Sequence, residues 1–331
     1  MPKPKAKRRR KRKTPILRFD REQAVKLCRS VIHSWQTRTN GFQGMDCPEA
    51  LLPDDIIPGS REHACFTFFF GWTNVYGQSA FNLARKCAEI HRDNRWVIDP
   101  SLELPSDADM EEAISPAVPF VWVNPERAVW WETCRTIVRD EYGSDPRNIF
   151  LFHGSSRDEF LRTFRRFPGI GPKIAQLLGL WFQDIAWGDD YLDLFRRPRW
   201  EEFQRVPLVP VDMWVMRLMF QCRVITRHQT DSHSRISRPI SDYLCKLCAD
   251  YELSHSDLSQ GLWHIGSEIC FKRPKRSRRP QDADAHCLLA CPVHDFCQYT
   301  IHEPGKAYQD KGTIGADHMQ PRRSLFTPRQ K

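Results

Sequence analysis

The segment at residues 167–175, which reads Phe-Pro-Gly-Ile-Gly-Pro-Lys-Ile-Ala, constrains the fold more than any other part of the chain. It lies between two stretches with helical periodicity, one over residues 156–166 and one that starts at Pro172. Proline suits the first turn of a helix, and Gly169 and Gly171 permit a tight turn and the close approach of another backbone. A helix start preceded by small residues presents free N–H groups, which favour a phosphate. The alternative is an ordinary helix–helix corner, since Gly and Pro mark many such corners.

Two further patterns lie downstream. Residues 209–217 read Val-Pro-Val-Asp-Met-Trp-Val-Met-Arg, and Asp212 is placed to cap the helix that begins after it. Near the C-terminus are four cysteines, the last three within eleven residues: Cys270, Cys287, Cys291 and Cys297. Four thiolates in such a stretch suit an iron–sulfur cubane, and they also satisfy tetrahedral zinc. The patterns therefore predict a metal centre, with cluster and zinc both open.

In this order, the three patterns resemble the motifs of the endonuclease III-like superfamily of helix-hairpin-helix DNA glycosylases, in its iron–sulfur-containing branch. The resemblance covers roughly residues 61–299 and is tightest around the motifs. It implies an all-α fold of two interleaved helical domains: a six-helix barrel with the helix-hairpin-helix, and a domain that holds a [4Fe-4S] cluster on the four cysteines. It also implies that Lys173 is the amine of a lyase-competent member and Asp212 the catalytic aspartate.

The chain departs from the family pattern in two places. The interval from Lys173 to Asp212 is thirty-nine residues, longer than in the family, so residues 187–207 are interpreted as an insertion near the mouth of the pocket. The cysteine spacing is Cys-x16-Cys-x3-Cys-x5-Cys, whereas the family has Cys-x6-Cys-x2-Cys-x5-Cys. Only the last interval matches, which is why zinc stays an alternative to the cluster.

Apolar periodicity predicts helices over residues 20–35, 125–142 and 211–223, and two more within residues 240–264. The buried face of the helix over residues 125–142 is expected to contain Ala128, Val129, Trp131, Cys134, Ile137 and Val138. The expected domains are a disordered basic tail (1–14), an N-terminal helix region that packs with the C-terminal domain (19–60), the barrel (61–186, with the helix-hairpin-helix at 156–186), the insertion (187–207), the cluster domain (208–299) and a polar C-terminal tail (300–331).

The net charge of +9 is concentrated at the N-terminus. Nine of the 50 Lys and Arg residues lie within residues 1–13, so the rest of the chain carries 41 basic and 41 acidic residues. Such a tail attracts phosphate at low salt, and nuclear import or simple solvation are its other interpretations. Any DNA-binding surface elsewhere must come from local clustering of charge.

Composition bears on the compartment. Hydrophobic residues at 40% and aromatic residues at 11% suffice for real cores, and no apolar run reaches the length of a membrane span. No apolar segment follows the basic N-terminus, so a secretory signal is not expected. Twelve cysteines then favour metal binding in a reducing compartment over disulfides. We expect an intracellular monomer without membrane association, nuclear in a eukaryote and cytoplasmic or at the nucleoid in a prokaryote.

Three groups of residues are predicted to contact double-stranded DNA. The hairpin contributes Gly169, Gly171 and Pro172, whose backbone would hold a phosphate. The loop before Cys287 contributes a basic patch, for which solvation is the alternative: Lys272, Arg273, Lys275, Arg276, Arg278 and Arg279. By resemblance, a polar side chain after the apolar run at residues 65–72 would wedge into the DNA stack, and Thr73, Asn74 and Gln78 are its candidates, against ordinary helix-end residues.

The implied chemistry is removal of a damaged or modified base with cleavage at the abasic site. A lysine amine can attack the sugar C1′, form a Schiff base and allow β-elimination, provided that it is partly unprotonated. Lys173 could instead only contact phosphate, which would leave a monofunctional glycosylase or nucleosidase relative. A non-catalytic DNA-binding helix-hairpin-helix protein is the other alternative. Cys245 and Cys248 are interpreted as buried structural thiols, or as partners of Cys287 and Cys291 in a zinc site.

Overall fold

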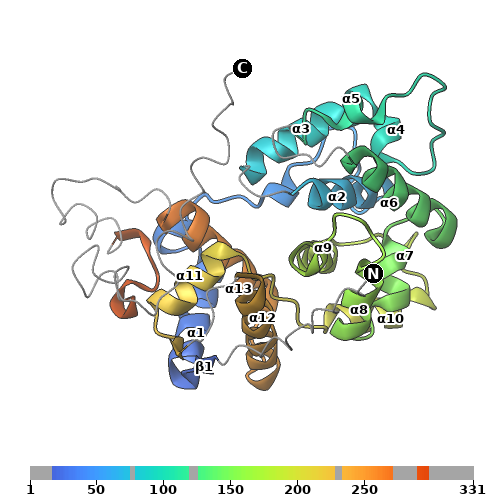
Figure 1. Ribbon diagram of the computed structural model, residues 1–331. Helices are drawn as coiled ribbons and strands as arrows, with labels where there is room; N and C mark the ends of the chain where they lie inside the picture. Colours follow the sequence, from blue (N-terminus) through green and yellow to red (C-terminus); the bar gives the residue numbers. More distant parts are fainter. Residues whose placement is uncertain (1–16, 75–78, 119–125, 228–232, 271–288, 298–331) are drawn as a thin grey trace, which may run out of the picture.

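The computed structural model describes residues 17–74, 79–118, 126–227, 233–270 and 289–297, and this part of the chain is predominantly helical, as expected (Figure 1). Up to the hairpin the elements are β1 (Arg18–Phe19), α1 (Arg21–Thr37), the 3-10 turns η1 (Asn40–Phe42) and η2 (Pro48–Ala50), α2 (Arg61–Thr73), α3 (Ala80–Asp93), α4 (Arg95–Ile98), α5 (Met110–Ile114), α6 (Arg127–Tyr142) and α7 (Arg147–His153). The remaining elements are α8 (Arg157–Phe164), α9 (Pro172–Asp184), α10 (Arg196–Gln204), α11 (Met213–Gln221), β2 (Ile225–Arg227), α12 (His233–Asp250), α13 (His255–His264), the π-helical turn η4 (Ile265–Cys270) and η5 (His294–Phe296).

Most predicted helices are confirmed together with their local signals. Asp20 caps α1 by accepting a hydrogen bond from the Gln23 amide at 3.0 Å. Helix α6 ends at Gly143, which adopts a left-handed conformation with φ of 63°. The expected apolar face of α6 is wrong at one position, because Val129 is 59% exposed. The short antiparallel pair of β1 and β2 was not predicted.

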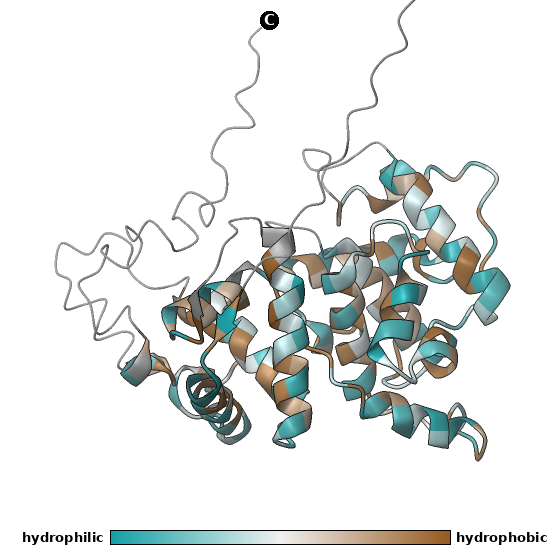
Figure 2. Cartoon of the chain, turned by 60° about the horizontal axis from the view of Figure 1, so that its bottom comes forward, coloured by the Kyte–Doolittle hydropathy of each residue, from teal (hydrophilic) through white to brown (hydrophobic). Residues whose placement is uncertain are grey.

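The first hydrophobic core, called the aromatic core below, draws its buried residues from residues 56–208. Helix α2 runs through it and is buried on all sides, which explains its uninterrupted apolar run. Phe150 stacks on Phe182 with ring centroids 4.1 Å apart, and Phe160, Phe164 and Phe203 surround it. Figure 2 shows that the helices carry hydrophilic and hydrophobic residues on different sides, as core packing requires.

The second hydrophobic core, called the thiol-rich core below, joins segments far apart in the sequence. Its buried residues come from residues 24–42 and 209–297, and six of them are cysteines: Cys28, Cys222, Cys245, Cys248, Cys291 and Cys297. Helices α1 and α13 pack closely, since a Cβ at Gly261 would lie 2.4 Å from Val31 Cγ1. In Figure 1 the helices of this core lie to the left, those of the aromatic core lie to the right, and α9 runs between them.

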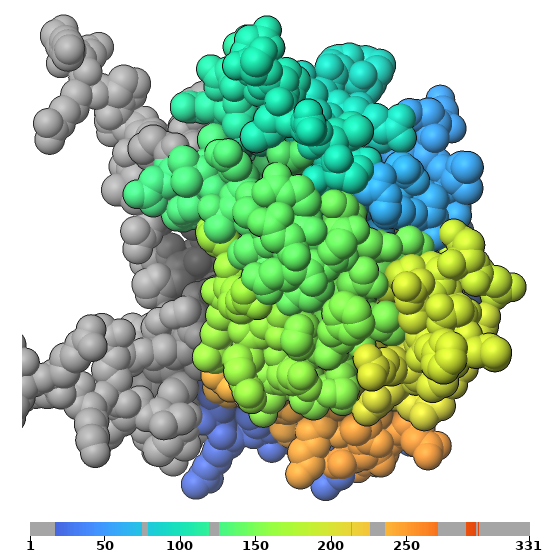
Figure 3. Space-filling model, turned by 90° about the vertical axis from the view of Figure 1, so that its right-hand side faces the viewer, coloured from blue at the N-terminus to red at the C-terminus, as the bar shows by residue number. Residues whose placement is uncertain are grey.

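The expected insertion at residues 187–207 is part of the aromatic core. It contains α10, whose Trp200 and Phe203 are 2% and 0% exposed and pack among the core aromatics. Its charged residues face outward, and Figure 3 shows the segment in yellow as part of the molecular surface beside the green helices. Residues 187–207 therefore contribute to core packing.

Candidate functional site

The turn of the hairpin is held by side chains from two other helices. Trp72 of α2 donates its indole N–H to the Pro168 carbonyl at 2.9 Å, and the Cys134 thiol of α6 donates to the same oxygen at 3.4 Å. Gly169 has φ of 81°, and a Cβ there would lie 2.9 Å from the Trp72 Nε1. Both the backbone conformation and the close approach of the indole therefore require glycine.

Helix α9 begins beside open space. Its N-cap is Gly171, which supplies no side-chain hydrogen bond, and Pro172 occupies the first turn. A Cβ at Gly171 would meet no atom within 4 Å, so the backbone amides at this end are accessible to a ligand. Lys173 lies in the same turn and is half-buried, and its ammonium forms no hydrogen bond or ion pair within the described residues.

Asp212 caps α11, as the sequence predicted. Its Oδ1 accepts hydrogen bonds from the amides of Trp214 at 2.8 Å and Val215 at 3.0 Å. The carboxylate is half-buried, and the second oxygen receives no hydrogen bond from the described residues. Capping fixes the orientation of the carboxylate and leaves Oδ2 free to face a ligand.

A buried polar network connects the hairpin to the segment that leads to Asp212. Arg157 of α8 donates to Gln176 Oε1 of α9 at 3.2 Å. The Ser241 hydroxyl of α12 lies 2.8 Å from the same Gln176 oxygen and 2.6 Å from the Val209 carbonyl oxygen. The network thereby links α8, α9 and α12 with the chain just before α11.

This network joins a residue that lies near Lys173 in the sequence to one that lies near Asp212. Gln176 lies three residues after Lys173, on the same face of α9, and Val209 lies three residues before Asp212. The two side chains themselves form no ion pair, because no N–O contact within 4.0 Å joins them in the described part of the chain. Lys173 and Asp212 therefore each lie three positions along the chain from a residue of this network, and their side chains are not in direct contact.

Three of the four predicted metal ligands lie close to a thiol that the sequence patterns did not include. Cys222, directly after α11, shares a side-chain hydrogen bond with Cys297. That bond, burial, and the nearby Cys297, Cys291 and Cys270 thiols raise the pKa of Cys222. The fourth predicted ligand, Cys287, lies outside the described residues.

The described thiols are neighbours without forming a closed ligand set. Among residues 17–74, 79–118, 126–227, 233–270 and 289–297, no group of three or more Cys, His, Asp or Glu side chains is arranged to hold a metal ion. As a donor set, however, the thiols of Cys222, Cys270, Cys291 and Cys297 suit soft metals such as zinc or an iron–sulfur cluster. The chemistry of the donors therefore suits a soft metal, whereas the arrangement of the described thiols does not complete a site for one.

Cys245 and Cys248 are buried in the thiol-rich core, at 4% and 3% exposure. Burial raises the pKa of the Cys248 thiol to about 12, so it is a protonated structural side chain. This agrees with their interpretation as structural thiols.

The predicted DNA contacts are only partly within the described residues. Thr73 is 0% exposed and its hydroxyl donates to the Phe70 carbonyl, so it is unavailable as a wedge. Asn74 is half-buried at the end of α2. Gln78 and all six basic residues of the predicted patch lie outside the described residues: Lys272, Arg273, Lys275, Arg276, Arg278 and Arg279.

Two carboxyl groups where the cores meet were also missed. Glu49, in η2, accepts a hydrogen bond from Gln260 of α13, and burial raises its pKa to about 7. Asp184, at the end of α9, accepts a hydrogen bond from Ser256 at 2.6 Å, and burial raises its pKa to about 6. No spacing pattern marks either residue, because the surroundings of each carboxyl group are completed by side chains far away in the sequence, Gln260 and Ser256.

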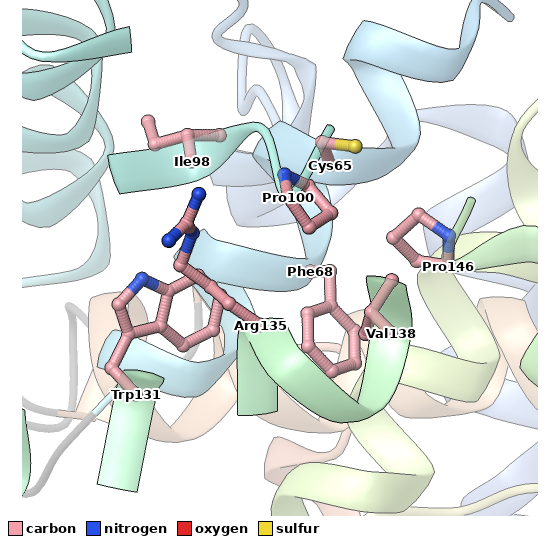
Figure 4. A pocket seen from close by; sticks show the side chains of 8 residues that line it. All are labelled: Cys65, Phe68, Ile98, Pro100, Trp131, Arg135, Val138 and Pro146. Carbon is pink, nitrogen blue, oxygen red and sulfur yellow. The ribbon is translucent and has the colours of Figure 1, made fainter. Parts of the chain in front are cut away.

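A small apolar pocket lies between α2, α4 and α6, away from these groups (Figure 4). It is lined by Cys65, Phe68, Ile98, Pro100, Trp131, Arg135, Val138 and Pro146. The Arg135 guanidinium donates to the carbonyls of Asp99 and Leu102 at 3.0 and 3.1 Å, so it stabilises the backbone after α4. The pocket contains neither predicted catalytic residue.

Comparison with models of known protein families finds no match, and a search of curated proteins finds none either. In the part of the chain that the structure describes, no helix combines the length and apolar character of a membrane span.

Proposed function

We propose that this chain is a DNA glycosylase with an associated lyase activity, which removes an altered base and cleaves the strand at the abasic site. The proposal includes two interleaved domains, built around the aromatic core and the thiol-rich core, with the site between them. The observation that carries it is the Arg157–Gln176–Ser241 network, which links the hairpin to the chain before Asp212.

Binding is proposed to begin at the hairpin. The Gly171 end of α9 has no side-chain cap and faces open space, so its amides can bind a backbone phosphate. The Trp72 bond to the Pro168 carbonyl keeps the turn in the required shape before DNA arrives. A rigid phosphate site of this kind positions the duplex while the target base rotates into a pocket.

Lys173 is the proposed nucleophile. Its amine forms a bond to C1′ as the bond between the sugar and the base breaks, and the base leaves with the bonding electrons and then gains a proton. Opening of the sugar ring gives a Schiff base on Lys173. Loss of a C2′ proton then breaks the bond from C3′ to the 3′ phosphate. Among the described residues no side chain holds the Lys173 amine in a hydrogen bond or ion pair, so the amine can approach the sugar.

Asp212 is the proposed partner of Lys173. The α11 amides hold Oδ1, and Oδ2 can then stabilise positive charge that develops on the sugar. The same oxygen can accept the proton of the Lys173 ammonium directly or through one water molecule. Asp212 therefore combines helix capping with a catalytic role.

The cysteines are proposed to hold a [4Fe-4S] cluster, with zinc as the alternative metal. A bound metal centre would link the C-terminal segment to the thiol-rich core through metal–thiolate bonds. Cys270 at the end of η4 and Cys291 with Cys297 in the C-terminal segment are the described ligands of the proposed set. Their role in this proposal is to anchor both ends of the basic loop over residues 271–280.

The test is a panel of duplex oligonucleotides that carry altered bases, assayed for base release and for strand cleavage separately. We expect the wild type to act on at least one member. Lys173→Gln is expected to lower strand cleavage at least about a hundredfold while it keeps most of the DNA affinity. Lys246→Gln, which changes an exposed lysine on α12, is the matched control and should leave both activities unchanged.

If the wild type releases no base from any duplex but binds DNA, the chain is a non-catalytic DNA-binding protein. If the wild type releases a base without cleaving the strand, the lyase activity fails and a monofunctional glycosylase is favoured. If strand cleavage survives Lys173→Gln, another residue carries the lyase activity and the assignment of Lys173 fails.

A further inference from the structure

Arg127, in the first turn of α6, is half-buried over the indole ring of Trp72. Its guanidinium carbon lies 5.1 Å from the centroid of that ring, and burial lowers the pKa of the guanidinium. Within the described residues this guanidinium takes part in no hydrogen bond or ion pair. The ring attracts the cation and fixes its position, but it supplies no counter-charge.

Other arginines around the aromatic core have anionic partners. Arg61 pairs with Asp99 at 2.6 Å, and Arg147 pairs with Asp145 at 2.7 Å. Moving a guanidinium partly out of water costs free energy, and a nearby anion offsets that cost. Residues 119–125, which precede α6 and lie outside the described part of the chain, contain no Asp or Glu. Arg127 is therefore a partly desolvated cation that has no anionic partner among the described residues.

Trp72 connects Arg127 to the turn of the hairpin. The indole N–H donates to the Pro168 carbonyl at 2.9 Å. A Cβ at Gly169 would lie 2.9 Å from the Trp72 Nε1 and 3.6 Å from the ring of Trp130, which is one helical turn after Arg127 on α6. Figure 1 shows α2 and α6 next to each other above α9. The turn therefore packs against the end of α6 that carries Arg127.

The same turn leads to the end of α9 where the proposed function places a phosphate. Gly171, the N-cap of α9, comes two residues after Gly169, and consecutive Cα atoms are only about 3.8 Å apart. The Arg127 guanidinium and the α9 amides thus flank one short stretch of backbone. Each DNA strand has a phosphate for every ~3.4 Å of the helix axis, so a strand held at the α9 amides presents further phosphates beside the turn.

We infer that Arg127 is a second phosphate-binding group of the hairpin, which donates to one DNA backbone phosphate while the α9 amides hold a neighbouring one. This inference rests on the DNA binding of the proposed function. A guanidinium can donate two parallel hydrogen bonds to a phosphate, which suits a cation whose position is fixed by an aromatic ring. Trp72 then holds the turn through its N–H and positions Arg127 through its face.

The test compares Arg127→Met with Arg139→Met in the full chain. Methionine keeps an apolar side chain over Trp72 and removes the charge. Arg139 lies on the same helix and pairs with Asp140 at 2.8 Å, so its replacement changes the net charge equally without removing the proposed contact. Affinity for a duplex oligonucleotide without altered bases is measured between about 50 and 200 mM salt.

We expect Arg127→Met to bind the duplex about tenfold more weakly at low salt, because one charge-assisted hydrogen-bond donor is lost. The slope of log affinity against log salt should become shallower by about one, as the loss of one phosphate contact requires. Arg139→Met should keep the wild-type slope. Arg127→Lys should recover most of the slope, since it restores a charge that can bind phosphate.

Thermal unfolding of the same variants separates phosphate binding from packing. Arg127→Met should keep a melting temperature close to that of the wild type, because the apolar contact with Trp72 remains. If Arg127 only covers the indole ring, Arg127→Met will keep the wild-type DNA affinity as well.

A second measurement uses the wild type, so that misfolding of a variant cannot produce the result. A dicarbonyl reagent that modifies arginine side chains is applied with and without the duplex, and the modified positions are mapped by peptide mass spectrometry. DNA should protect Arg127 from modification, whereas Arg139 should react equally in both samples.

The inference is overturned if Arg127→Met keeps the wild-type affinity and salt slope, or if DNA leaves the modification of Arg127 unchanged. A wild type that does not bind the duplex overturns it together with the proposed function. A wild type that binds with the expected dependence on Arg127 but releases no altered base supports the Arg127 contact and overturns the enzymatic proposal alone.

Discussion

The aromatic core and the thiol-rich core are built in different ways. The first takes its residues from one continuous stretch and fills its interior mainly with phenylalanine and tryptophan. The second joins α1 to segments about two hundred residues later, contains few aromatic rings, and buries six cysteines. Because distant segments need long loops to close, the second core gains more from a covalent or metal connection than the first. The comparison predicts that the proposed metal centre would stabilise the thiol-rich core and leave the stability of the aromatic core unchanged.

The largest expected effect concerns the aromatic core. Phe150→Ala removes a ring that stacks on Phe182 and is expected to lower the free energy of unfolding by about 4 kcal/mol. Denaturant unfolding, followed by circular dichroism, measures this loss. It should be the same with and without a chelator, since the aromatic core does not depend on the metal. A loss that changes with the chelator would contradict the separation of the two cores.

Asp212→Asn separates capping from catalysis in the thiol-rich core. Asparagine caps a helix about as well as aspartate, so the melting temperature should change little. The rate of base release should fall about a hundredfold, because the charge that stabilises the sugar is lost. Asp109→Asn, at the matching cap of α5, is the control and should change neither quantity. An unchanged rate of base release for Asp212→Asn would show that Asp212 only caps α11.

The contact between the cores should make stability depend on pH. Glu49 and Asp184 have pKa values raised to about 7 and about 6, so the folded chain keeps protons that the unfolded chain releases. The contribution of these protons to the free energy of unfolding is fully present below the ordinary carboxyl pKa of about 4. It is lost as pH rises through 6 and 7, which lowers the free energy of unfolding by about 2 kcal/mol.

Glu49→Gln tests this prediction, because glutamine has no proton to lose. Thermal unfolding between pH 4.5 and 7.5 should show a flatter stability profile for this variant than for the wild type. Glu132→Gln, at an exposed position of α6, is the control and should follow the wild type. A wild-type stability that rises with pH over this range would contradict the raised pKa values of the two carboxyl groups.

The smallest expected effect concerns the turn of the hairpin. Gly169→Ala forces a side chain into a left-handed conformation against Trp72, at a cost of about 1–2 kcal/mol, and should weaken DNA binding. Gly171→Ala meets no neighbouring atom, so it should leave stability unchanged and affect only the binding of phosphate. DNA titrations and thermal unfolding of the pair distinguish strain in the turn from loss of the phosphate site.

Local signals in the sequence were sufficient for the hairpin, the Asp212 cap and most helices, because capping and periodicity involve residues within a few positions of each other. They were insufficient for contacts between distant elements. Cys222 lies forty-eight residues before Cys270, so no spacing pattern connects them, and only the packing of α11 on η4 does. Val129 was expected to be buried, because apolar character alone does not distinguish the edge of a helix face from its centre. The burial of Glu49 likewise depends on a partner far away in the sequence, Gln260.

The central claim is that Lys173 and Asp212 act on the same nucleotide. Borohydride reduction of the wild type in the presence of abasic DNA tests it most directly, with the attachment site mapped by peptide mass spectrometry. The account predicts a covalent adduct on Lys173 that forms more slowly with Asp212→Asn. An adduct on a different residue, or base release without any adduct, would contradict it.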